Sequence, residues 1–375
     1  MYIYIIAFII AFILLYISEK MAKKGKKVLI FEILSIGLLA FVAAIRDETI
    51  GTDVLIYVKP VFQLCNQLGF GRINDIWYNV EIGYKIFNCI IALFTSKISI
   101  YLFFQQVFIL GFAYLGIKGI YKKNYSFVYL IYLLIFYNRS LNIVRQAMAI
   151  SLCIYSLKFL LENKNFKFIL IVLLAFLFHK TALFFLLAII IYKLYKKNAK
   201  YVYYMAIFII IVGLIFIFLF PECIKLITSI GIMSTDYLYY LDNYVDDIGT
   251  ISSFELLLDI TYIVVYIIFN KLRKKENSSF YFILALIDVI CLIISTKYTA
   301  ANRFGMYFRI PVVLFLLSNM DVIFVNKYSK VNVGNIIAVV ISVIFWYYVF
   351  VYGKSGGTVP FTINQDSYFY QIFLK

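Results

Sequence analysis

Residues 201–220 read YVYYMAIFIIIVGLIFIFLF, a run without one charged side chain. A helix that crosses the hydrocarbon core of a bilayer needs about 20 such residues. Other continuous apolar runs follow one another along the whole chain. A transmembrane β-barrel would instead show segments of about ten residues with alternating hydrophobicity. The sequence therefore predicts an all-α, polytopic integral membrane protein.

The composition excludes the soluble classes of protein. The chain is 64% hydrophobic and only 14% charged, whereas an average soluble domain is about half apolar and about a quarter charged. One globular core cannot bury that much apolar surface. A soluble enzyme, a disordered chain and a disulfide-stapled secreted domain are therefore excluded.

The cysteines and the first segment give no sign of secretion. The five cysteines are odd in number and far apart, so neither a disulfide framework nor a metal site follows from them. Residues 1–17 lack a basic start and a small-residue cleavage site, which predicts a membrane span rather than a signal peptide.

We expect about twelve membrane helices in a single transmembrane domain over residues 1–375. Their ranges are 2–18, 28–45, 98–120, 125–138, 142–161, 168–178, 181–192, 201–220, 253–269, 280–297, 304–319 and 334–352. The two shortest meet at Phe178-His179-Lys180, which predicts one kinked element or two half-spans that dip into a cavity.

The basic clusters predict the orientation of the bundle. Lys-rich connectors lie at 20–27, 118–124, 158–167, 193–200, 270–276 and 321–333. Because cytoplasmic loops carry an excess of Lys and Arg, we place these connectors inside, and twelve crossings then put both termini outside. This bias explains the net charge of +16, so no nucleic-acid partner is expected.

Residues 82–96 are also apolar enough to be a span. An extra crossing there would put the connector 118–124 or the next basic cluster on the wrong side. We therefore expect an amphipathic helix on the outer surface, with Phe87, Ile91 and Phe94 at helical spacing. Thirteen spans with one violated loop is the alternative.

Two outer connectors, 46–97 and 221–252, are long, and large outer loops often carry binding residues. Their charged residues include Arg46, Asp47, Glu48, Asp53, Asp75, Glu81, Glu222, Asp236, Asp242, Asp246 and Asp247. In the first connector, Gly51 permits a tight turn, Thr52 and Asp53 can cap the segment that follows, and Glu81 is favourable at a helix N-terminus.

The few arginines are segregated from the lysines. Seven occur in the chain, and five fall on the predicted outer side or at outer helix ends: Arg46, Arg72, Arg139, Arg145 and Arg303. A guanidinium grips phosphate or carboxylate with two hydrogen bonds, and an arginine at membrane depth is costly. We expect functional roles for Arg145, Arg303 and Arg46; snorkelling or pairing with outer acids is the alternative.

Two further patterns predict an anion-binding site and a group for proton transfer. Asn142, Arg145 and Gln146 stand at the start of an apolar helix, which favours an anion site; a helix end capped by Asn142 is the alternative. His179 is the only histidine and falls at the break between the two shortest runs, where a group that titrates near neutral pH can transfer a proton.

Four short motifs in this order resemble the EpsG family of bacterial exopolysaccharide proteins, which are similar to Wzy-type polysaccharide polymerases. The motifs are Arg46…Gly51-Thr52-Asp53…Tyr57, Glu81-x-Gly83-Tyr84, Asn142-x-x-Arg145-Gln146-x-x-Ala149 and Phe178-His179-x-Thr181-Ala182. The resemblance covers roughly residues 40–310, and Arg303 resembles a later family arginine. Ile82 and Thr181 stand where the family often has Pro and Ser, but neither departure removes a charged group.

The resemblance implies polymerisation of lipid-linked repeat units into exopolysaccharide or capsule, in the plasma membrane and on its outer face. The donor would be a glycan on undecaprenyl pyrophosphate, and the acceptor a sugar hydroxyl of the next lipid-linked unit. The pyrophosphate leaving group supplies the energy, so no cofactor is expected. The other implied partners are membrane lipid and the flippase and chain-length regulator of the same pathway.

For this reaction we expect catalytic roles for His179, Arg145, Arg303 and Asp53. The expected substrate-binding residues are Arg46, Thr52, Glu81, Tyr84, Asn142, Gln146 and Thr181. The arginines would stabilise charge on the pyrophosphate. The base that takes the acceptor proton would be His179, Asp53 or Glu81, with His179 favoured as the base and Asp53 for binding the acceptor.

Three rival functions stay open. A transporter, such as a flippase for lipid-linked oligosaccharide, would use the intramembrane acids Glu32, Asp259 and Asp288, which we otherwise expect to be structural partners. A membrane acyltransferase would use His179 as its base. A structural assembly partner would use neither His179 nor Arg145. Only a polymerase would lengthen the glycan.

Overall fold

The computed structural model of the chain describes residues 1–77, 79–198, 200–231, 238, 241, 249–323 and 333–374. In this part of the chain every regular element is helical, and the one β contact is an isolated bridge between Arg46 and Ile363. The predicted all-α class is confirmed. Within the described ranges, seven helices are long and apolar enough to cross a membrane: Tyr2–Ala22, Ile98–Ile120, Val144–Leu161, Tyr201–Ser229, Ser278–Ser295, Ala300–Ser318 and Val333–Tyr352.

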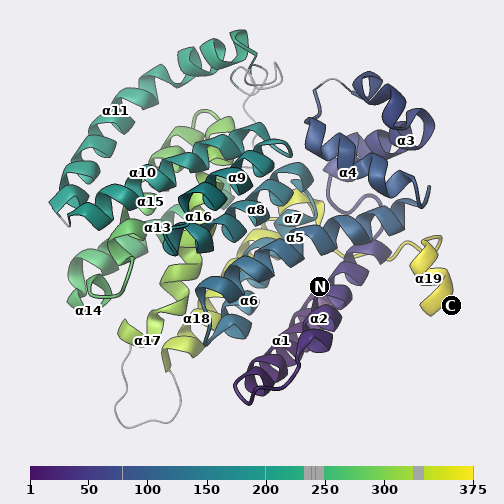
Figure 1. Cartoon of the computed structure of the whole chain (residues 1–375), viewed down its shortest axis with the longest axis horizontal. Coiled ribbons are helices and arrows are strands. Elements are labelled where there is room, and N and C mark those ends of the chain that lie inside the picture. The colour runs from purple at the N-terminus through teal and green to yellow at the C-terminus, as the bar shows by residue number, and fades with distance from the viewer. Residues whose placement is uncertain are drawn as a thin grey trace. The chain divides into compact units, whose positions relative to one another are not determined.

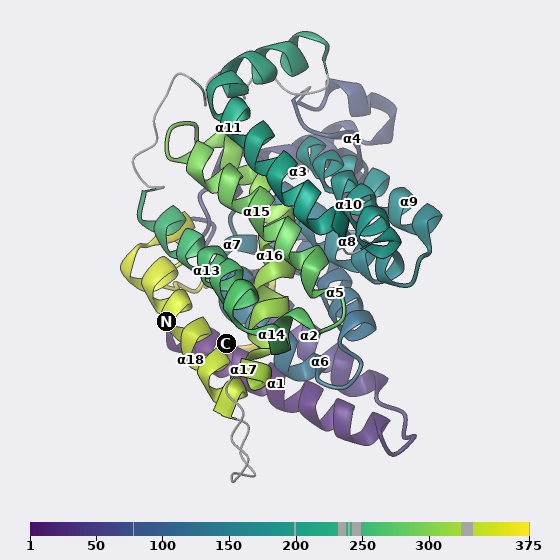
Figure 2. The ribbon, with the colours of Figure 1, turned by 90° about the vertical axis from the view of Figure 1, so that its left-hand side faces the viewer.

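Every one of the twelve predicted ranges contains helix, although the number of crossings stays a prediction. The chain divides into two compact units, which are described separately below. Unit 1 comprises Met1–His179 and Trp346–Lys375, and unit 2 comprises Lys180–Phe345. Figures 1 and 2 show the helices of both units from two directions.

Unit 1 is built on a row of packed helices. These are α1 (Tyr2–Ala22), α2 (Leu29–Ile45), α5 (Ile98–Ile120), α6 (Tyr125–Tyr132), α7 (Asn138–Ser140), α8 (Val144–Leu161) and α9 (Asn165–Phe176), with a π-helical turn, Leu133–Tyr137, between α6 and α7. Neighbours in the row α1, α2, α5, α8, α9 pack on one another. A Cβ on Gly116 would lie 2.6 Å from the Ile154 carbonyl oxygen, so the missing side chain lets α5 and α8 approach closely, as small residues do in membrane bundles.

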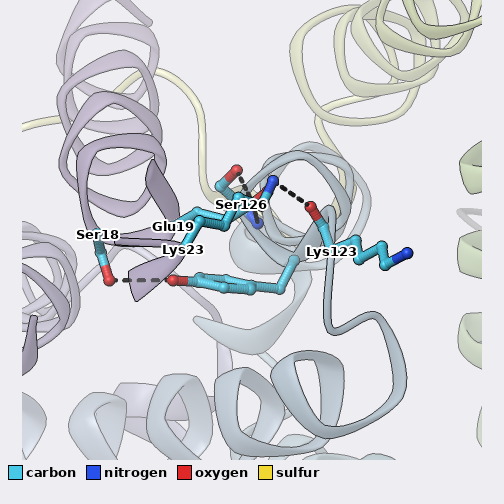
Figure 3. A network of polar contacts seen from close by, with 6 residues as sticks. Ser18, Glu19, Lys23, Lys123 and Ser126 are labelled. Atoms are coloured by element: carbon cyan, nitrogen blue, oxygen red, sulfur yellow. Dashed lines mark hydrogen bonds and ion pairs between the residues drawn. The ribbon is translucent and has the colours of Figure 1, made fainter. Parts of the chain in front are cut away.

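The ends of α1 and α6 are joined by a polar network (Figure 3). Glu19 accepts hydrogen bonds from the backbone N–H and hydroxyl of Ser126, and an ammonium hydrogen bond from Lys23 at 2.9 Å. Lys23 also donates to the backbone carbonyl of Lys123 at 3.2 Å. The network brings together the basic connectors 20–27 and 118–124, which the twelve-span interpretation places on one side of the membrane.

The long connector 46–97 is folded into short helices rather than open, and its position on the outer side stays a prediction. It contains a π-helical turn (Val54–Val58), α3 (Lys59–Leu68), a 3-10 helix (Phe70–Asp75) and α4 (Ile82–Ala92). Helix α3, which was not predicted, has Pro60 in its first turn and ends at Gly69 with a φ of +62°. With 11 residues, α4 is shorter than a span and packs on α3 and α5.

The C-terminal segment returns to unit 1. After α18 (Val333–Trp346) come a π-helical turn (Tyr347–Tyr352), a 3-10 turn (Ser355–Gly357) and α19 (Tyr368–Phe373). The indole of Trp346 donates to Asn138 Oδ1 at 2.8 Å, and Asn138 Nδ2 donates to the Thr358 hydroxyl at 3.2 Å. These bonds, and the bridge to Arg46, fix residues 358–363 beside the end of α2.

Unit 2 has a core of three helices, with α13 (Gly249–Ile268) and α16 (Ala300–Ser318) both packed on α15 (Ser278–Ser295). Figures 1 and 2 show α15 and α16 side by side. The other described elements of unit 2 are a 3-10 helix (Lys180–Leu186), α10 (Leu187–Lys197), α11 (Lys200–Ser229), α14 (Asn270–Arg273), α17 (Met320–Ile323) and α18 up to Phe345.

The helix predicted at 201–220 continues through Pro221 to Ser229, so the first part of the connector 221–252 is helical rather than a loop. The acids of that connector, Asp236, Asp242, Asp246 and Asp247, lie outside the described residues. The predicted break after 178 is confirmed, since α9 ends at Phe176 and a separate 3-10 helix begins at Lys180.

Candidate functional site

Asn142 holds the loop of the first motif. Its side-chain oxygen accepts hydrogen bonds from the Thr52 hydroxyl at 2.9 Å and from the Asp53 backbone N–H at 3.1 Å. Gly51 has a φ of +83°, and a Cβ there would lie 2.3 Å from the Leu141 carbonyl oxygen, so this position requires glycine. The N-cap of α8 is Ile143; the alternative that Asn142 caps this helix was wrong.

Tyr57 connects Asp53 to Arg145. Its hydroxyl donates a hydrogen bond to Asp53 Oδ2 at 2.7 Å, and the Arg145 guanidinium carbon lies 4.6 Å from the centre of its ring. This is the geometry of a cation–π contact. Burial, and then the Asp53 carboxylate, raise the pKa of Tyr57 well above its usual value. The phenol therefore stays neutral and remains a donor. Asp53 occupies the N-cap position of the π-helical turn, but its side chain makes no capping bond there.

Arg145 also pairs with Glu81. Its Nη1 donates to Glu81 Oε2 at 2.6 Å and approaches the Asn79 carbonyl oxygen at 3.5 Å. The two side chains are 22% and 10% exposed, so the charge-assisted bond is shielded from most of the solvent. The Nε of Arg145 is buried and has no hydrogen-bond partner among the described residues. Glu81 and Tyr57 thus hold the guanidinium in place, and Glu81 occupies only its Nη1.

The start of α4 lies against the end of α9. Gly83 donates its backbone N–H to the Leu177 carbonyl oxygen at 2.8 Å. The next residue, Tyr84, is fully buried, accepts a hydrogen bond from the Tyr101 hydroxyl at 2.9 Å and packs edge-on against Tyr57. Tyr84 therefore helps to fix the ring of Tyr57. His179 follows Leu177 by two residues and is only 6% exposed.

Arg46 is buried, and no carboxylate pairs with it among the described residues. It is 1% exposed, and neither Nε nor Nη1 has a hydrogen-bond partner in this part of the chain. Burial lowers its pKa to about 10, while the nearby phenols of Tyr4 and Tyr137 act in the opposite direction. The group still carries its charge at neutral pH and is an uncompensated cation in the interior of unit 1.

The structure thus brings together Thr52, Asp53, Glu81, Asn142 and Arg145 from the predicted set. Gln146 lies in the first turn of α8 and is 3% exposed. Thr181 and Arg303 belong to unit 2, where the Thr181 hydroxyl shares a hydrogen bond with Tyr307 at 3.0 Å and Arg303 lies in the first turn of α16. That these two residues join the same site stays a prediction.

Comparison with protein families agrees with the four motifs. A family model described as EpsG family matches residues 29–363. The chain belongs to the EpsG family. EpsG is a Wzy-like polymerase family, so the family points to a membrane polysaccharide polymerase. No curated protein and no solved structure matches the chain.

One part of the candidate site was missed by sequence reasoning. Gly51 donates its N–H to the Gly357 carbonyl oxygen at 3.4 Å, and a Cβ on Gly356 would lie 3.0 Å from Asn142 Nδ2. Gly356 and Gly357 have φ values of +67° and +60°. The only signal in the sequence was the adjacent pair of glycines after Lys354 and Ser355, at positions far from every motif.

Glu32 of this EpsG chain lies outside the candidate site. In unit 1, Glu32 accepts hydrogen bonds from Lys118 at 2.6 Å and from Ser18 at 3.0 Å, as expected for a structural partner. The described residues hold no group of three or more His, Cys, Asp or Glu arranged for a metal ion.

Unit 2 also contains an apolar cavity of about 350 Å³. It lies between α10, α11 and α15 and is lined by residues such as Ile191, Phe208 and Ile290. Its almost purely apolar wall suits a hydrocarbon chain. This cavity was not predicted from the sequence.

Proposed function

We propose that this chain polymerises lipid-linked oligosaccharide units by glycosyl transfer on the outer leaflet of the plasma membrane. The observation that carries the proposal is the position of Arg145, which is fixed between Glu81 and the ring of Tyr57 and lies next to Asp53 through that same tyrosine. The product would be exopolysaccharide or capsule. Membership of the EpsG family supports the same reaction.

The reaction needs no external energy source. A hydroxyl of the incoming lipid-linked unit attacks the anomeric carbon of the growing glycan. The bond from that carbon to the pyrophosphate oxygen breaks, and undecaprenyl pyrophosphate leaves with the electron pair. The hydroxyl proton passes to a base on the protein. The protein must therefore stabilise the negative charge that develops on the pyrophosphate and must accept this proton.

Cationic side chains in a partly dry site suit the pyrophosphate. In our proposal, the guanidinium of Arg145 contacts the pyrophosphate through the part that Glu81 does not occupy, and Arg46 contributes a buried positive charge in the same unit. Arg303 of unit 2 stays a predicted member of this set. Arginine suits the role better than lysine, because the planar fork can bond two phosphate oxygens together.

Glu81 and Asp53 have different roles in the proposed reaction, and neither is assigned as the base. Glu81 accepts from Arg145, so we assign it to orienting the guanidinium rather than to proton transfer. Asp53 accepts from Tyr57 and sits on the loop that Asn142 holds, which suits binding of the acceptor sugar. We keep His179 as the base, because an imidazole takes up and releases a proton near neutral pH.

The test uses the full chain purified into lipid nanodiscs. Lipid-linked repeat units are isolated from cells in which this chain is deleted and then incubated with wild type or Arg145→Lys. A polymerase gives a ladder of longer glycans with the wild type and little or none with the variant. Units of unchanged length with wild type would refute the proposal and would leave the transporter interpretation. Acylated units of unchanged length would indicate an acyltransferase.

A further inference from the structure

The core of unit 2 contains a charged cluster outside the proposed site. It consists of Glu255 and Asp259 on α13, Asp288 on α15 and Arg309 on α16, and each of these side chains is at most 2% exposed. The aspartates were noted in the sequence, but Arg309 was not singled out. Three carboxyl groups and one guanidinium, all buried, make an unusual combination, because buried charges require partners.

Arg309 is fully engaged with two of the three acids. Its Nε and Nη2 donate to the two oxygens of Asp288 at 2.8 and 2.9 Å, and its Nη1 donates to Glu255 Oε2. Gly305 lies one turn before Arg309 on α16, and a Cβ there would be 2.1 Å from Asp288 Oδ1. The missing side chain makes room for this two-bonded pair, which neutralises one negative charge.

Asp259 is the third acid and has no such partner. It lies one turn after Glu255 on the same face of α13, it is 0% exposed, and neither of its oxygens has a hydrogen-bond partner among the described residues. Asp288 is close enough for the two carboxyl groups to share a hydrogen bond once one of them carries a proton, and Arg309 and Glu255 also act on Asp259 electrostatically.

Among the described residues of α15 and α16, which pack against α13, the other cation is Arg303, which lies in the first turn of α16, six residues before Arg309. It is not among the groups that act most strongly on Asp259. On α15, the thiol of Cys291 borders Asp288 and Arg309. Further along α13, the Tyr262 hydroxyl donates a hydrogen bond to the Ser278 carbonyl oxygen at 2.8 Å. Helix α18 carries no titratable residue between Val333 and Trp346.

The basic residues that follow Asp259 in the sequence lie too far from it to offset the charge of its carboxylate. Lys271 and Arg273 lie on α14, beyond the end of α13 and at least 12 residues after Asp259. Arg309 is the cation that acts on Asp259. Two ionised carboxylates in contact, with a single guanidinium already used, are strongly unfavourable.

We propose that Asp259 binds one proton and donates it in a hydrogen bond to Asp288, so that the cluster is a buried proton-binding site of unit 2. The bound proton converts two adjacent negative charges into a carboxylic acid that hydrogen-bonds to a carboxylate. A proton suits the site better than a metal cation, because both oxygens of Asp288 and one oxygen of Glu255 already accept from Arg309. A metal ion at those oxygens would face the positive guanidinium.

Infrared spectroscopy of the full chain in nanodiscs at pH 7 tests the proposal directly. The wild type should show the C=O stretch of a neutral carboxylic acid, and Asp259→Asn should remove it. The matched control is Asp366→Asn, since Asp366 is exposed and its loss should leave the band unchanged. A wild type without the band, or a band that survives in Asp259→Asn, would overturn the proposal.

Two further measurements test the same proposal, and the first of them uses the wild type alone. In the wild type, the band should be the same in KCl and NaCl; its loss in NaCl would mean that the site binds sodium instead. Folding should bind the Asp259 proton, so its contribution to stability is present at low pH and lost as pH rises. The unfolding constant of the wild type should therefore rise relative to Asp259→Asn by up to about tenfold per pH unit. Equal slopes would contradict the proposal.

Discussion

The backbone N–H of Gly83 donates a hydrogen bond to the carbonyl oxygen of Leu177 at 2.8 Å. This contact joins the start of α4 to the end of α9, two residues before His179. A Cβ at position 83 would lie 2.6 Å from that oxygen and 2.8 Å from the Leu177 Cβ. Only glycine lets the two backbones approach this closely, so the contact fixes where Glu81 enters the site.

Gly83→Ala should therefore push α4 away from α9. We expect a loss of about 1–3 kcal/mol of stability, as for other overpacked positions, together with shorter or less abundant polymer. Thermal unfolding of the purified protein and the glycan ladder measure the two effects. Gly111→Ala is the control, because a Cβ on Gly111 of α5 would meet nothing within 4 Å. Equal behaviour of the two variants would show that the close approach is unimportant.

The pairing of Arg145 with Glu81 should be measurable as energetic coupling. We expect Glu81→Gln and Arg145→Lys each to cost about 1–3 kcal/mol of stability, and the double variant to cost less than their sum. Polymer formation should fall by about 10²-fold in Arg145→Lys, as for loss of a charge-stabilising donor.

The control for this cycle is the exposed pair Lys164–Glu162, whose side chains are 53% and 39% exposed. Its coupling should stay below about 1 kcal/mol. Strictly additive effects at Arg145 and Glu81 would mean that the pair does not orient the guanidinium.

Tyr57→Phe should separate the role of the Tyr57 hydroxyl from that of its ring. The ring contact with Arg145 remains, but Asp53 loses the donor at 2.7 Å. We expect about 1 kcal/mol of lost stability and reduced polymer length, with Tyr2→Phe, 73% exposed, as the silent control. Because burial raises the pKa of Tyr57, its deprotonation should not limit the alkaline side of the wild-type pH profile. An alkaline limb that disappears in Tyr57→Phe would contradict this.

Arg46→Leu should stabilise the protein and still abolish polymer formation. Two nitrogens of this buried cation have no hydrogen-bond partner among the described residues, so its removal relieves a desolvation cost. Apolar replacements of buried charges can gain about 1–4 kcal/mol. Arg72→Leu is the control: Arg72 is 65% exposed and paired with Asp75, so its loss should change stability by about 0.5 kcal/mol or less. An Arg46→Leu variant with full activity would remove Arg46 from the mechanism.

The helices of the chain were the most predictable feature. Apolar runs such as 98–120 predict α5 by length and composition alone, and the break at His179 was visible as a gap between two short runs. The helix α3 was missed because residues 59–68 mix polar and apolar side chains. Such a mixture does not have the continuous apolar pattern of a membrane span. The formation of α3 depends instead on its packing against α4.

The motif residues were found by their chemistry, but their partners were not. Arg145 and Glu81 were each singled out, yet nothing in the sequence paired them across 64 positions. The alternative that Asn142 caps a helix was wrong, because it holds the loop of Thr52 and Asp53 instead. Hydrogen bonds between distant segments depend on how the helices pack, and a local pattern carries no record of that packing.

The sequence by itself determined the membrane class, the positions of most helices and the family, because these follow from apolar length and from short local motifs. Tertiary structure decided which groups meet: Gly356 beside Asn142, Tyr57 between Asp53 and Arg145, and Arg309 against Asp288. The physical reason is that a buried polar group must find a partner in space, and that partner can lie anywhere along the chain.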